Sequence, residues 1–298
     1  MKNIKFNKHY KNFGIISFIL ILSSILLLIF NGLNYGIDFK GGTLIELRTI
    51  NETTDIAKLR KALNNLNLGD VSVKNFGKKN DYIVKFEKRN LNDPNFISNL
   101  KIDLSKLIGE TFDFRRVENV GPKVSDELLK SGIIAIALSL TAMLIYIWIR
   151  FEWQFSLGAI VALFHDVFIT LGFFSLFRLE INLSIVAAVL TIVGYSMNDT
   201  VVIFDRVREN LKKYSDVKIF ELTNISINET LSRTIITSIT TLLALISIYL
   251  FGGEILKGFS LAMILGVIIG TYSSIYIANP VLVYLNVNQS TILKEDKI

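Results

Sequence analysis

The 298-residue chain contains no cysteine and only two histidines, His9 and His165. The absence of cysteine excludes disulfides, thiolate metal ligands and a thiol nucleophile. Two histidines so far apart in the sequence also make a histidine-based metal cluster implausible. Charged residues are scarce, at 19%, whereas 51% of the residues are hydrophobic. A soluble protein of this length does not need so much apolar surface, so the composition predicts a membrane protein and no cofactor.

Six charge-poor apolar runs divide the chain, and the shortest has 18 residues. A helix needs roughly 20 residues to cross a ~30 Å hydrocarbon core, and it satisfies its own backbone groups there. The first run is too long for a signal peptide and ends without a small-residue cleavage pattern, so we expect an uncleaved anchor. We therefore predict six transmembrane helices, at 13–33, 132–149, 155–177, 181–204, 234–251 and 258–287.

The basic residues indicate the orientation of these helices, because lysine and arginine in short loops favour the cytoplasm. With a cytoplasmic N-terminus, the inside segments contain most of them, whereas the short outside loops contain only Arg178 and Lys257. This asymmetry explains the net charge of +6 without nucleic acid. We expect both end segments, 1–12 and 288–298, to be cytoplasmic. We also expect the five-helix region 132–287 to carry a cytoplasmic amphipathic segment at 205–232, which we interpret as a surface helix.

Residues 34–131 are polar enough to form one folded domain outside the membrane. Alternating patterns predict strands at 42–49, 71–76, 82–86 and 111–117, and helical spacing predicts helices at 54–66, with Thr53 or Thr54 as its cap, and 94–108. The order β-α-β-β-α-β is that of a ferredoxin-like α+β domain. The predicted fold class is thus an α-helical integral membrane protein with six transmembrane helices and one ferredoxin-like extracytoplasmic domain.

Three ionisable residues lie within or beside the apolar runs, where they are costly enough to suggest function. Asp166 is near the middle of the third run, Asp199 lies late in the fourth run, and Arg233 opens the fifth run. Consecutive spans are antiparallel, so Asp199 and Arg233 have similar depths and could pair if their helices touch. Arg233 could instead only reach the inner surface, and Asp166 could be a permanently protonated packing residue.

Small and hydroxyl side chains accompany these residues at helical spacing, as is typical of helix interfaces in lipid. One stripe follows Asp166 and a second follows Arg233, and several polar residues surround Asp199. A Gly-x-x-x-Gly at Gly266 and Gly270 would allow close approach of another helix, although this motif alone is common. The expected supporting polar residues are Ser196, Asn198, Thr200 and Thr237, and the two stripes are Gly158, Ala162, Asp166 and Thr170, and Arg233, Thr237, Thr240 or Thr241, and Ala244.

Several motifs together resemble the SecD/SecF family of the RND superfamily. The segment 34–43, which contains Gly36, Asp38, Gly41 and Gly42, resembles the glycine-rich motif that this family has after its first span. The most specific match is 194–206, Gly-Tyr-Ser-Met-Asn-Asp-Thr-Val-Val-Ile-Phe-Asp-Arg, followed by Arg-Glu-Asn at 208–210. Shorter matches are Arg-Phe-Glu-Trp at 150–153, His-Asp-Val at 165–167 and Ser-Arg-Thr at 232–234.

The resemblance implies a protein-export role in the bacterial inner membrane rather than an enzyme. A six-span member of this family pairs with SecD beside the SecYEG channel, with YajC as a further candidate partner and an unfolded preprotein as substrate. Such a unit uses the proton-motive force, or sodium in some bacteria, in the late stages of export. The coupling residues of the family fall on Asp199 and Arg233, while Asp166 has the motif and a less defined role.

Three other functions remain open from the sequence. A lipid or drug carrier of the RND type usually has twelve spans and two large outer domains in one chain. An intramembrane aspartyl protease needs two carboxyls about 3 Å apart, whereas Asp166 and Asp199 have different predicted depths. A passive scaffold that only stabilises a channel complex needs no ion coupling at all.

Overall fold

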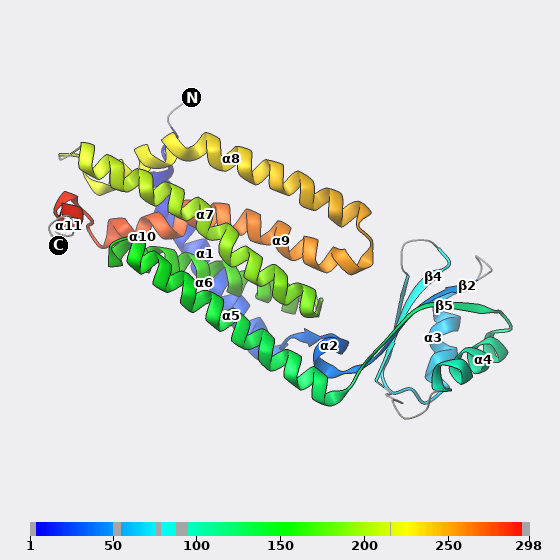
Figure 1. The fold of residues 1–298 in the computed structure, drawn as a ribbon. Coiled ribbons are helices and arrows are strands. Elements are labelled where there is room, and N and C mark those ends of the chain that lie inside the picture. The colour runs from blue at the N-terminus through cyan, green and yellow to red at the C-terminus, as the bar shows by residue number, and fades with distance from the viewer. Residues whose placement is uncertain (1–3, 50–54, 76–78, 88–94, 215, 294–298) are drawn as a thin grey trace.

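The structure is a computed structural model that describes residues 4–49, 55–75, 79–87, 95–214 and 216–293. A bundle of long helices carries a small region of strands and helices at one end, and both chain termini lie at the opposite end (Figure 1). The proposed caps Thr53 and Thr54 lie outside the described residues. The helix that follows begins after Asp55, whose carboxylate accepts a hydrogen bond from the Ala57 backbone.

Six helices of the described chain are long and apolar enough to cross a membrane, as the sequence predicts. The first is preceded by a short 3-10 turn, Phe6–His9, and the last is continued by a wide turn and a shorter helix. Their bounds are α1 Tyr10–Phe30, α5 Pro122–Arg150, α6 Trp153–Leu176, α7 Leu183–Lys213, α8 Ile219–Phe251 and α9 Glu254–Ser273, and a short helix α11, Gln289–Leu293, follows near the C-terminus.

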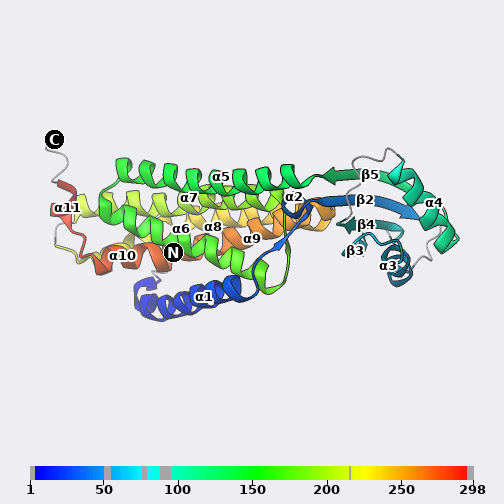
Figure 2. The same ribbon diagram turned by 90° about the horizontal axis from the view of Figure 1, so that it is seen from below.

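The six spans are not equivalent, because α6, α7 and the last span form the centre of the bundle. At least half of the most apolar window is buried in these three, against 11–17% in the other three. The outer helices instead present large apolar side chains, such as Phe18 on α1 and Leu243 on α8, to the surroundings. Figure 2 shows α1 and α5 on opposite sides of the other helices. A polar side chain on α6 or α7 can therefore be enclosed by protein on all sides.

The last span is interrupted by a π-helical turn, Ser274–Ala278, between α9 and α10 (Asn279–Tyr284). Pro280 has no backbone N–H to continue an α-helical ladder. The Asn279 side chain donates a hydrogen bond to the Ser274 carbonyl at 2.7 Å, which satisfies one acceptor of the wide turn. A π-helical turn inside an α-helix is rare and often lies at a functional site.

The strands and helices beyond the bundle follow the predicted order. They are β2 Gly42–Thr49, α3 Ile56–Asn64, β3 Val71–Asn75, β4 Asp81–Phe86, α4 Phe96–Ile108 and β5 Phe112–Val120. The four strands form an antiparallel sheet in the order β3-β4-β2-β5. Leu59 and Leu63 of α3 and Leu104 of α4 share one buried cluster with Ile45 of β2 and Val84 of β4. This core is separate from the apolar core of the bundle.

The predicted amphipathic segment 205–232 is not a separate surface helix. Instead, α7 continues to Lys213 and α8 begins at Ile219. No glycine or proline interrupts residues 204–213, so nothing ends the helix where the apolar run ends. The apolar face is real, because Val207, Leu211 and Leu222 are buried in the core of the bundle. The segment is thus the joined ends of two long helices.

Candidate functional site

Two glycines bring α9 against α7 at the centre of the bundle. A Cβ on Gly266 would collide with the Ile192 side chain, and a Cβ on Gly270 would lie 3.0 Å from the Ser196 Cβ. The Gly-x-x-x-Gly motif therefore serves a contact within this chain. On the other side of the site, a Cβ on Gly158 of α6 would lie 2.8 Å from the Ala278 carbonyl oxygen. These close approaches let short hydroxyl side chains bridge the helices.

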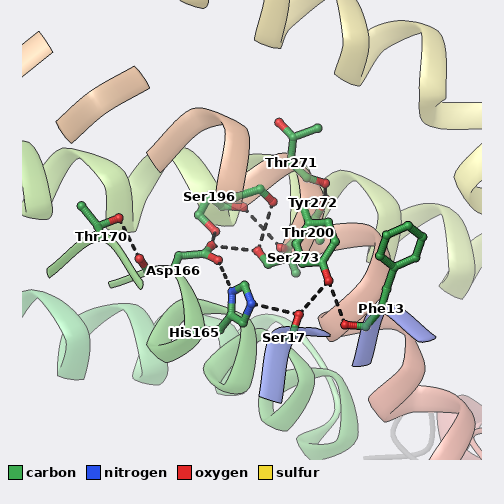
Figure 3. Close-up of polar contacts among 12 residues, drawn as sticks. Phe13, Ser17, His165, Asp166, Thr170, Ser196, Thr200, Thr271, Tyr272 and Ser273 are labelled. Carbon is green, nitrogen blue, oxygen red and sulfur yellow. Dashed lines mark hydrogen bonds and ion pairs between the residues drawn. The ribbon is translucent and has the colours of Figure 1, made fainter. Parts of the chain in front are cut away.

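Asp166 of α6 is completely enclosed and has three side-chain partners (Figure 3). Its Oδ1 lies 2.8 Å from Nδ1 of His165, and its Oδ2 accepts hydrogen bonds from Ser196 of α7 at 2.5 Å and Ser273 of α9 at 2.8 Å. The predicted stripe is correct, because Gly158, Ala162, Asp166 and Thr170 are all buried. A buried carboxyl tends to be neutral or fully hydrogen-bonded, and the three partners meet the second condition.

His165 extends this network to α1. Its Nε2 lies 3.2 Å from Oγ of Ser17, and that oxygen lies 2.7 Å from the hydroxyl of Tyr272. The Tyr272 hydroxyl donates to the Phe13 carbonyl at 2.9 Å. The Tyr272 ring also stacks on the imidazole, with centroids 5.9 Å apart. His165 is thus a member of a polar chain rather than an isolated packing residue.

Asp199 of α7 is 3% exposed and less fully bonded than Asp166. Its Oδ2 accepts a hydrogen bond from Thr271 of α9 at 3.3 Å, and the Thr271 hydroxyl lies 2.8 Å from that of Ser238 on α8. Arg233 is near enough to interact electrostatically with Asp199. Across the described residues, however, no ion pair or hydrogen bond joins the two side chains, so the predicted direct pairing is not present in this state.

The face of α8 that carries Arg233 points away from the interior. Arg233, Thr240 and Ala244 are exposed, and Thr237 is half-buried. The Thr237 hydroxyl donates to carbonyls of its own helix. Instead, Ser238 provides the inward hydroxyl, and it is buried. The predicted stripe on α8 is therefore one position away from the residues that reach the site.

The other expected supporting residues include two that are buried at the site and one that is exposed. Ser196 donates directly to Asp166, and Thr200 is buried and donates to the Ser196 carbonyl at 3.2 Å. Asn198 is exposed on the outer side of α7. The sequence analysis assigned no site role to Ser17, Ser238, Thr271, Tyr272 or Ser273. A run of hydroxyl residues at 271–274, directly after Gly270 in an apolar span, is the signal that could have found the last three.

The glycine-rich motif forms a joint between the sheet and the start of α7. Strand β1, Asn34–Tyr35, pairs in parallel with β6, Glu180–Ile181, and Gly36 donates to the Ile181 carbonyl at 2.8 Å. The short helix α2, Ile37–Lys40, then places Oδ2 of Asp38 2.9 Å from the backbone N–H of Leu183, the first residue of α7. Asp38 thus adds a second acceptor at the start of the helix that carries Ser196 and Asp199, where an anionic group is favourable. The N-cap of this helix is Asn182, whose side chain accepts from the Ile185 N–H at 3.1 Å.

The two adjacent glycines fit this joint because their backbone needs unusual conformations. Gly41 has φ +74° and Gly42 has φ +134°, in the region that residues with a Cβ rarely adopt. A Cβ on Gly42 would also lie 2.7 Å from the Phe86 carbonyl oxygen of β4. A second link joins the sheet to this joint, because Lys85 of β4 forms an ion pair with Glu180 of β6.

Ion pairs join α5, α6 and α7 at the end of the bundle that lies away from the start of α7. Arg150 contacts Asp205 at 3.0 Å, and Arg208 contacts Glu152 at 3.1 Å. Glu152 is only 3% exposed, so the second pair lies in the protein's interior. These four residues come from two of the motifs singled out in the sequence. The structure shows how these residues pair, which the sequence alone did not indicate.

The acidic side chains of the site do not cluster. Among the described residues, no group of three or more His, Cys, Asp and Glu side chains could hold a metal ion. No hydrogen bond joins the carboxyls of Asp166 and Asp199 in the described chain, because each bonds to different hydroxyls. An aspartyl protease needs the two carboxyls to share a proton, so the arrangement does not fit that mechanism.

The fold and site define a polytopic membrane protein in which buried carboxylates and hydroxyls link the central helices. One of these helices, α7, begins at a joint that leads to a separate domain with a four-stranded sheet. Residues 101–288 match the family described as "Protein export membrane protein SecD/SecF, C-terminal", and residues 26–49 match "SecD/SecF GG Motif". The chain therefore belongs to the SecD/SecF family of protein-export membrane proteins.

Curated relatives agree with this assignment. "Protein translocase subunit SecF" of Rickettsia bellii (strain OSU 85-389) is 48% identical over 252 residues, which cover 84% of this chain and 82% of the relative. The protein of the same name from Rickettsia akari is 45% identical over 285 residues, covering 93% and 92%. That of Cereibacter sphaeroides is 46% identical over 275 residues, covering 89% and 84%.

Two solved structures are similar to the chain over almost its whole length. The crystal structure of SecDF, a translocon-associated membrane protein from Thermus thermophilus, has a TM-score of 0.84 and 33% identity and covers 95% of this chain. A SecDF structure in a super-membrane-facing form has a TM-score of 0.71 and 32% identity and covers all of it. The chain spans only 38% and 40% of those two chains.

Proposed function

We propose that the chain is the SecF-type subunit of a protein translocase that works with a SecD-type partner. The proposed unit uses the proton-motive force to assist late, ATP-independent stages of preprotein export through SecYEG, with YajC as a further partner. The names and coverage of the relatives support the subunit assignment, and the SecDF chains, which are more than twice as long as the part matched, support a SecD-type second half. The unit acts as an ion-coupled translocase and not as an enzyme.

The observation that carries the proposal is the position of Asp199. Its carboxylate lies in the apolar bundle, accepts a long hydrogen bond from Thr271 and interacts weakly with the Ser238 hydroxyl. A proton or a mobile cation can replace such weak partners. Burial in a low dielectric disfavours the ionised carboxylate, whereas a nearby guanidinium favours it. Movement of Arg233 toward Asp199 would therefore release a bound proton, and movement away would restore binding.

The joint at the start of α7 gives this step a route to the outer domain. Asp38 accepts from the first residue of α7 and lies within the motif that leads into β2, while Asp199 and Ser196 lie further along the same helix. A rotation or shift of α7 would therefore act on the sheet through Asp38 and the β1–β6 pair. Each proton that crosses 100 mV supplies about 2.3 kcal/mol for such work.

We further propose the topology that the basic residues indicate. Residues 1–12 and 288–298 would be cytoplasmic, the bundle would comprise 13–33 and 132–287, and 34–131 would form a ferredoxin-like domain outside the cytoplasm of a bacterial inner-membrane protein. The element order and the antiparallel sheet order β3-β4-β2-β5 support that type of domain. Reporter fusions test the topology: a fusion at Lys79 should report an outside location and one at Lys213 an inside location. An inside report at Lys79 would overturn it.

The test of coupling is Asp199→Asn in inverted membrane vesicles that contain the partner subunit and the channel. Asparagine keeps the shape and can accept the Thr271 hydrogen bond, but it cannot exchange a proton. We expect normal assembly and loss of gradient-dependent export. A protonophore and a sodium ionophore, applied separately to the parent, identify the ion.

A passive scaffold gives a different result in the same vesicles. Asp199→Asn would then export as well as the parent wherever the complex assembles, and both would respond equally to the ionophores. A lipid or drug carrier would lose transport of a small apolar substrate instead. Asn198→Gln is the matched control, because it changes an adjacent, outward-facing residue without adding a charge.

A further inference from the structure

The polar chain from Asp166 to Phe13 has one end that can only accept hydrogen bonds. A backbone carbonyl has no proton to give, so the Tyr272 hydroxyl must donate to Phe13 across their 2.9 Å contact. That hydroxyl has a single proton, so it must accept at its 2.7 Å contact with Ser17. The direction of every other bond in the chain follows from this fixed end.

The Ser17 hydroxyl therefore donates its only hydrogen bond to Tyr272, and it must accept a hydrogen bond from His165. Nε2 of His165 therefore carries a proton, which it donates over 3.2 Å. At the other side of the ring, Nδ1 and Oδ1 of Asp166 are 2.8 Å apart. Two lone pairs would repel at this distance, so one further proton must lie between these atoms. Oδ2 accepts from Ser196, and the single proton of Ser273 has a shorter contact with Oδ2, at 2.8 Å, than with the Gly270 carbonyl, at 3.1 Å. Oδ2 therefore supplies no alternative donor.

From this count we propose that Asp166 and His165 form a proton-binding site of their own, distinct from Asp199, and that the Ser17–Tyr272 hydroxyls are its relay. In the observed arrangement the pair holds two protons, one on Nε2 and one shared with the carboxyl, and is neutral overall. The site deepens the proposed function, because it gives a proton-coupled protein a second place to bind the ion.

Release of one proton is balanced along the relay. The Nε2 proton passes to Oγ of Ser17, the proton of Ser17 passes to the Tyr272 oxygen, and the proton of Tyr272 leaves to water. Nδ1 keeps the proton that it shares with Asp166, whose carboxylate is now ionised. Ser17 now donates to Nε2 and Tyr272 donates to Ser17, so both of these hydrogen bonds have reversed direction. The Phe13 carbonyl loses its tyrosine donor, which carries the change to the start of α1.

The surroundings suit such a relay. Asp166 and His165 are sealed, at 0% and 1% exposure, whereas Tyr272 and Phe13 are half-buried. Phe13 lies near the end of α1 where both termini are found (Figure 1), so the relay leads from the middle of α6 toward that end of the bundle.

Few other ionisable groups lie near the pair. In the part of the chain that the structure describes, Tyr272 is the ionisable group that joins the hydrogen bonds of the pair, and Tyr276 packs against the Tyr272 ring. Helices α1, α5, α8 and α10 bring no ionisable side chain of the described residues within hydrogen-bond distance of the pair. No lysine or arginine of the described chain bonds to the pair. Its proton balance therefore depends on the relay rather than on a fixed counter-charge.

Nitrogen-15 NMR of histidine-labelled protein tests the site directly, because the whole chain contains only two histidines. In the full-length His9→Gln variant, reconstituted in lipid bilayers, every imidazole signal comes from His165. We expect a proton on Nε2 at low pH and a change to the tautomer with a proton on Nδ1 alone as the pH rises. An Nε2 proton that persists over the whole pH range in which the protein stays folded would overturn the proposal.

Two variants identify the groups involved. In Asp166→Asn the amide oxygen accepts from the two serines, so its NH₂ faces Nδ1 and holds the proton on Nε2; the tautomer change should disappear. Tyr272→Phe removes the hydroxyl that orients Ser17 as an acceptor. We expect about tenfold weaker proton binding, a shift of the midpoint by about one pH unit to lower pH, as for the loss of one hydrogen bond.

Tyr276→Phe is the matched control, because it removes a neighbouring tyrosine hydroxyl that lies outside the relay, and it should leave the midpoint unchanged. Should Tyr272→Phe fold poorly, Ser17→Ala interrupts the same relay and should also shift the midpoint. An unshifted midpoint in the folded relay variant, or the same tautomer change in Asp166→Asn, would refute the proposal. The NMR measurements do not require export activity, so their outcome is independent of the export test of Asp199.

Discussion

The two buried carboxylates of this protein differ in how completely their neighbours bond to them. Asp166 has partners on both oxygens and is held by residues of α6, α7 and α9. Asp199 has a long hydrogen bond from Thr271 and a weak interaction with Ser238, and in the described chain the nearby guanidinium of Arg233 forms no ion pair with it. A saturated site resists change, whereas an undersaturated site can take up a proton, an ion or a new partner at small cost. The comparison suggests that Asp199 changes its contacts during the cycle and that Asp166 changes mainly its proton.

The largest effect should come from the contact that supports both sites. Gly270→Leu would place side-chain atoms against Ser196, whose Cβ would be 3.0 Å from the new Cβ, and would separate α9 from α7. We expect the unfolding free energy to fall by about 3 kcal/mol, as measured by thermal unfolding in detergent. Gly194→Leu is the control, since that glycine of α7 is exposed and a Cβ at this position would have no atom within 4 Å. Equal losses in both variants would refute the packing argument.

The second prediction tests saturation itself. Asp166→Ala leaves His165 and Ser196 without their acceptor, whereas Ser273 can still donate to the Gly270 carbonyl, and each buried orphan group costs about 1–3 kcal/mol. Asp199→Ala leaves Thr271 bonded to Ser238. We expect Asp166→Ala to lower the unfolding free energy by about 2 kcal/mol more than Asp199→Ala, as judged by denaturant titration of the two variants in the same detergent. A larger loss in Asp199→Ala would reverse the comparison.

A smaller effect is expected at the joint. Asp38→Ala removes one of the two side-chain acceptors at the start of α7, while the N-cap Asn182 keeps its bond to Ile185, so the loss should be about 0.5 kcal/mol. Asp38→Asn retains an acceptor oxygen and should recover most of that loss. If Asp38 also carries movement of α7 to the outer domain, export should fall more in the alanine variant than its stability loss explains. Thermal unfolding and vesicle export, measured on the same preparations, separate the two contributions.

The smallest effect on stability should be that of Arg233→Gln. Arg233 is exposed on α8 and makes no ion pair in the described chain, so the expected change is within about 0.5 kcal/mol. Gradient-dependent export should nevertheless be lost, because the charge that controls Asp199 is gone. Arg233→Lys should restore it only in part, since lysine lacks the planar donor fork. A strongly destabilised Arg233→Gln variant would show a structural role instead.

Much of the architecture could be predicted because it depends on local patterns. Apolar runs of sufficient length determine spanning helices, and alternation predicted β2 at 42–49 with the bounds found in the structure. Asp166 and Asp199 were found because an ionisable residue in such a run stands out against its neighbours. The segment 205–232 was misjudged because periodicity shows an apolar face but does not show that two long helices supply it.

Local sequence specified the spans, the element order of the outer region and the residues that could carry charge through an apolar bundle. Which hydroxyls meet those residues depended instead on tertiary packing. Ser196, Thr271 and Ser273 come together because Gly270 permits close helix packing, and Ser238 rather than Thr237 faces inward because of the rotation of α8. Asp38 reaches α7 from far along the chain. Such contacts follow from helix rotation and separation, which no local pattern specifies, because they are settled by packing among all six spans.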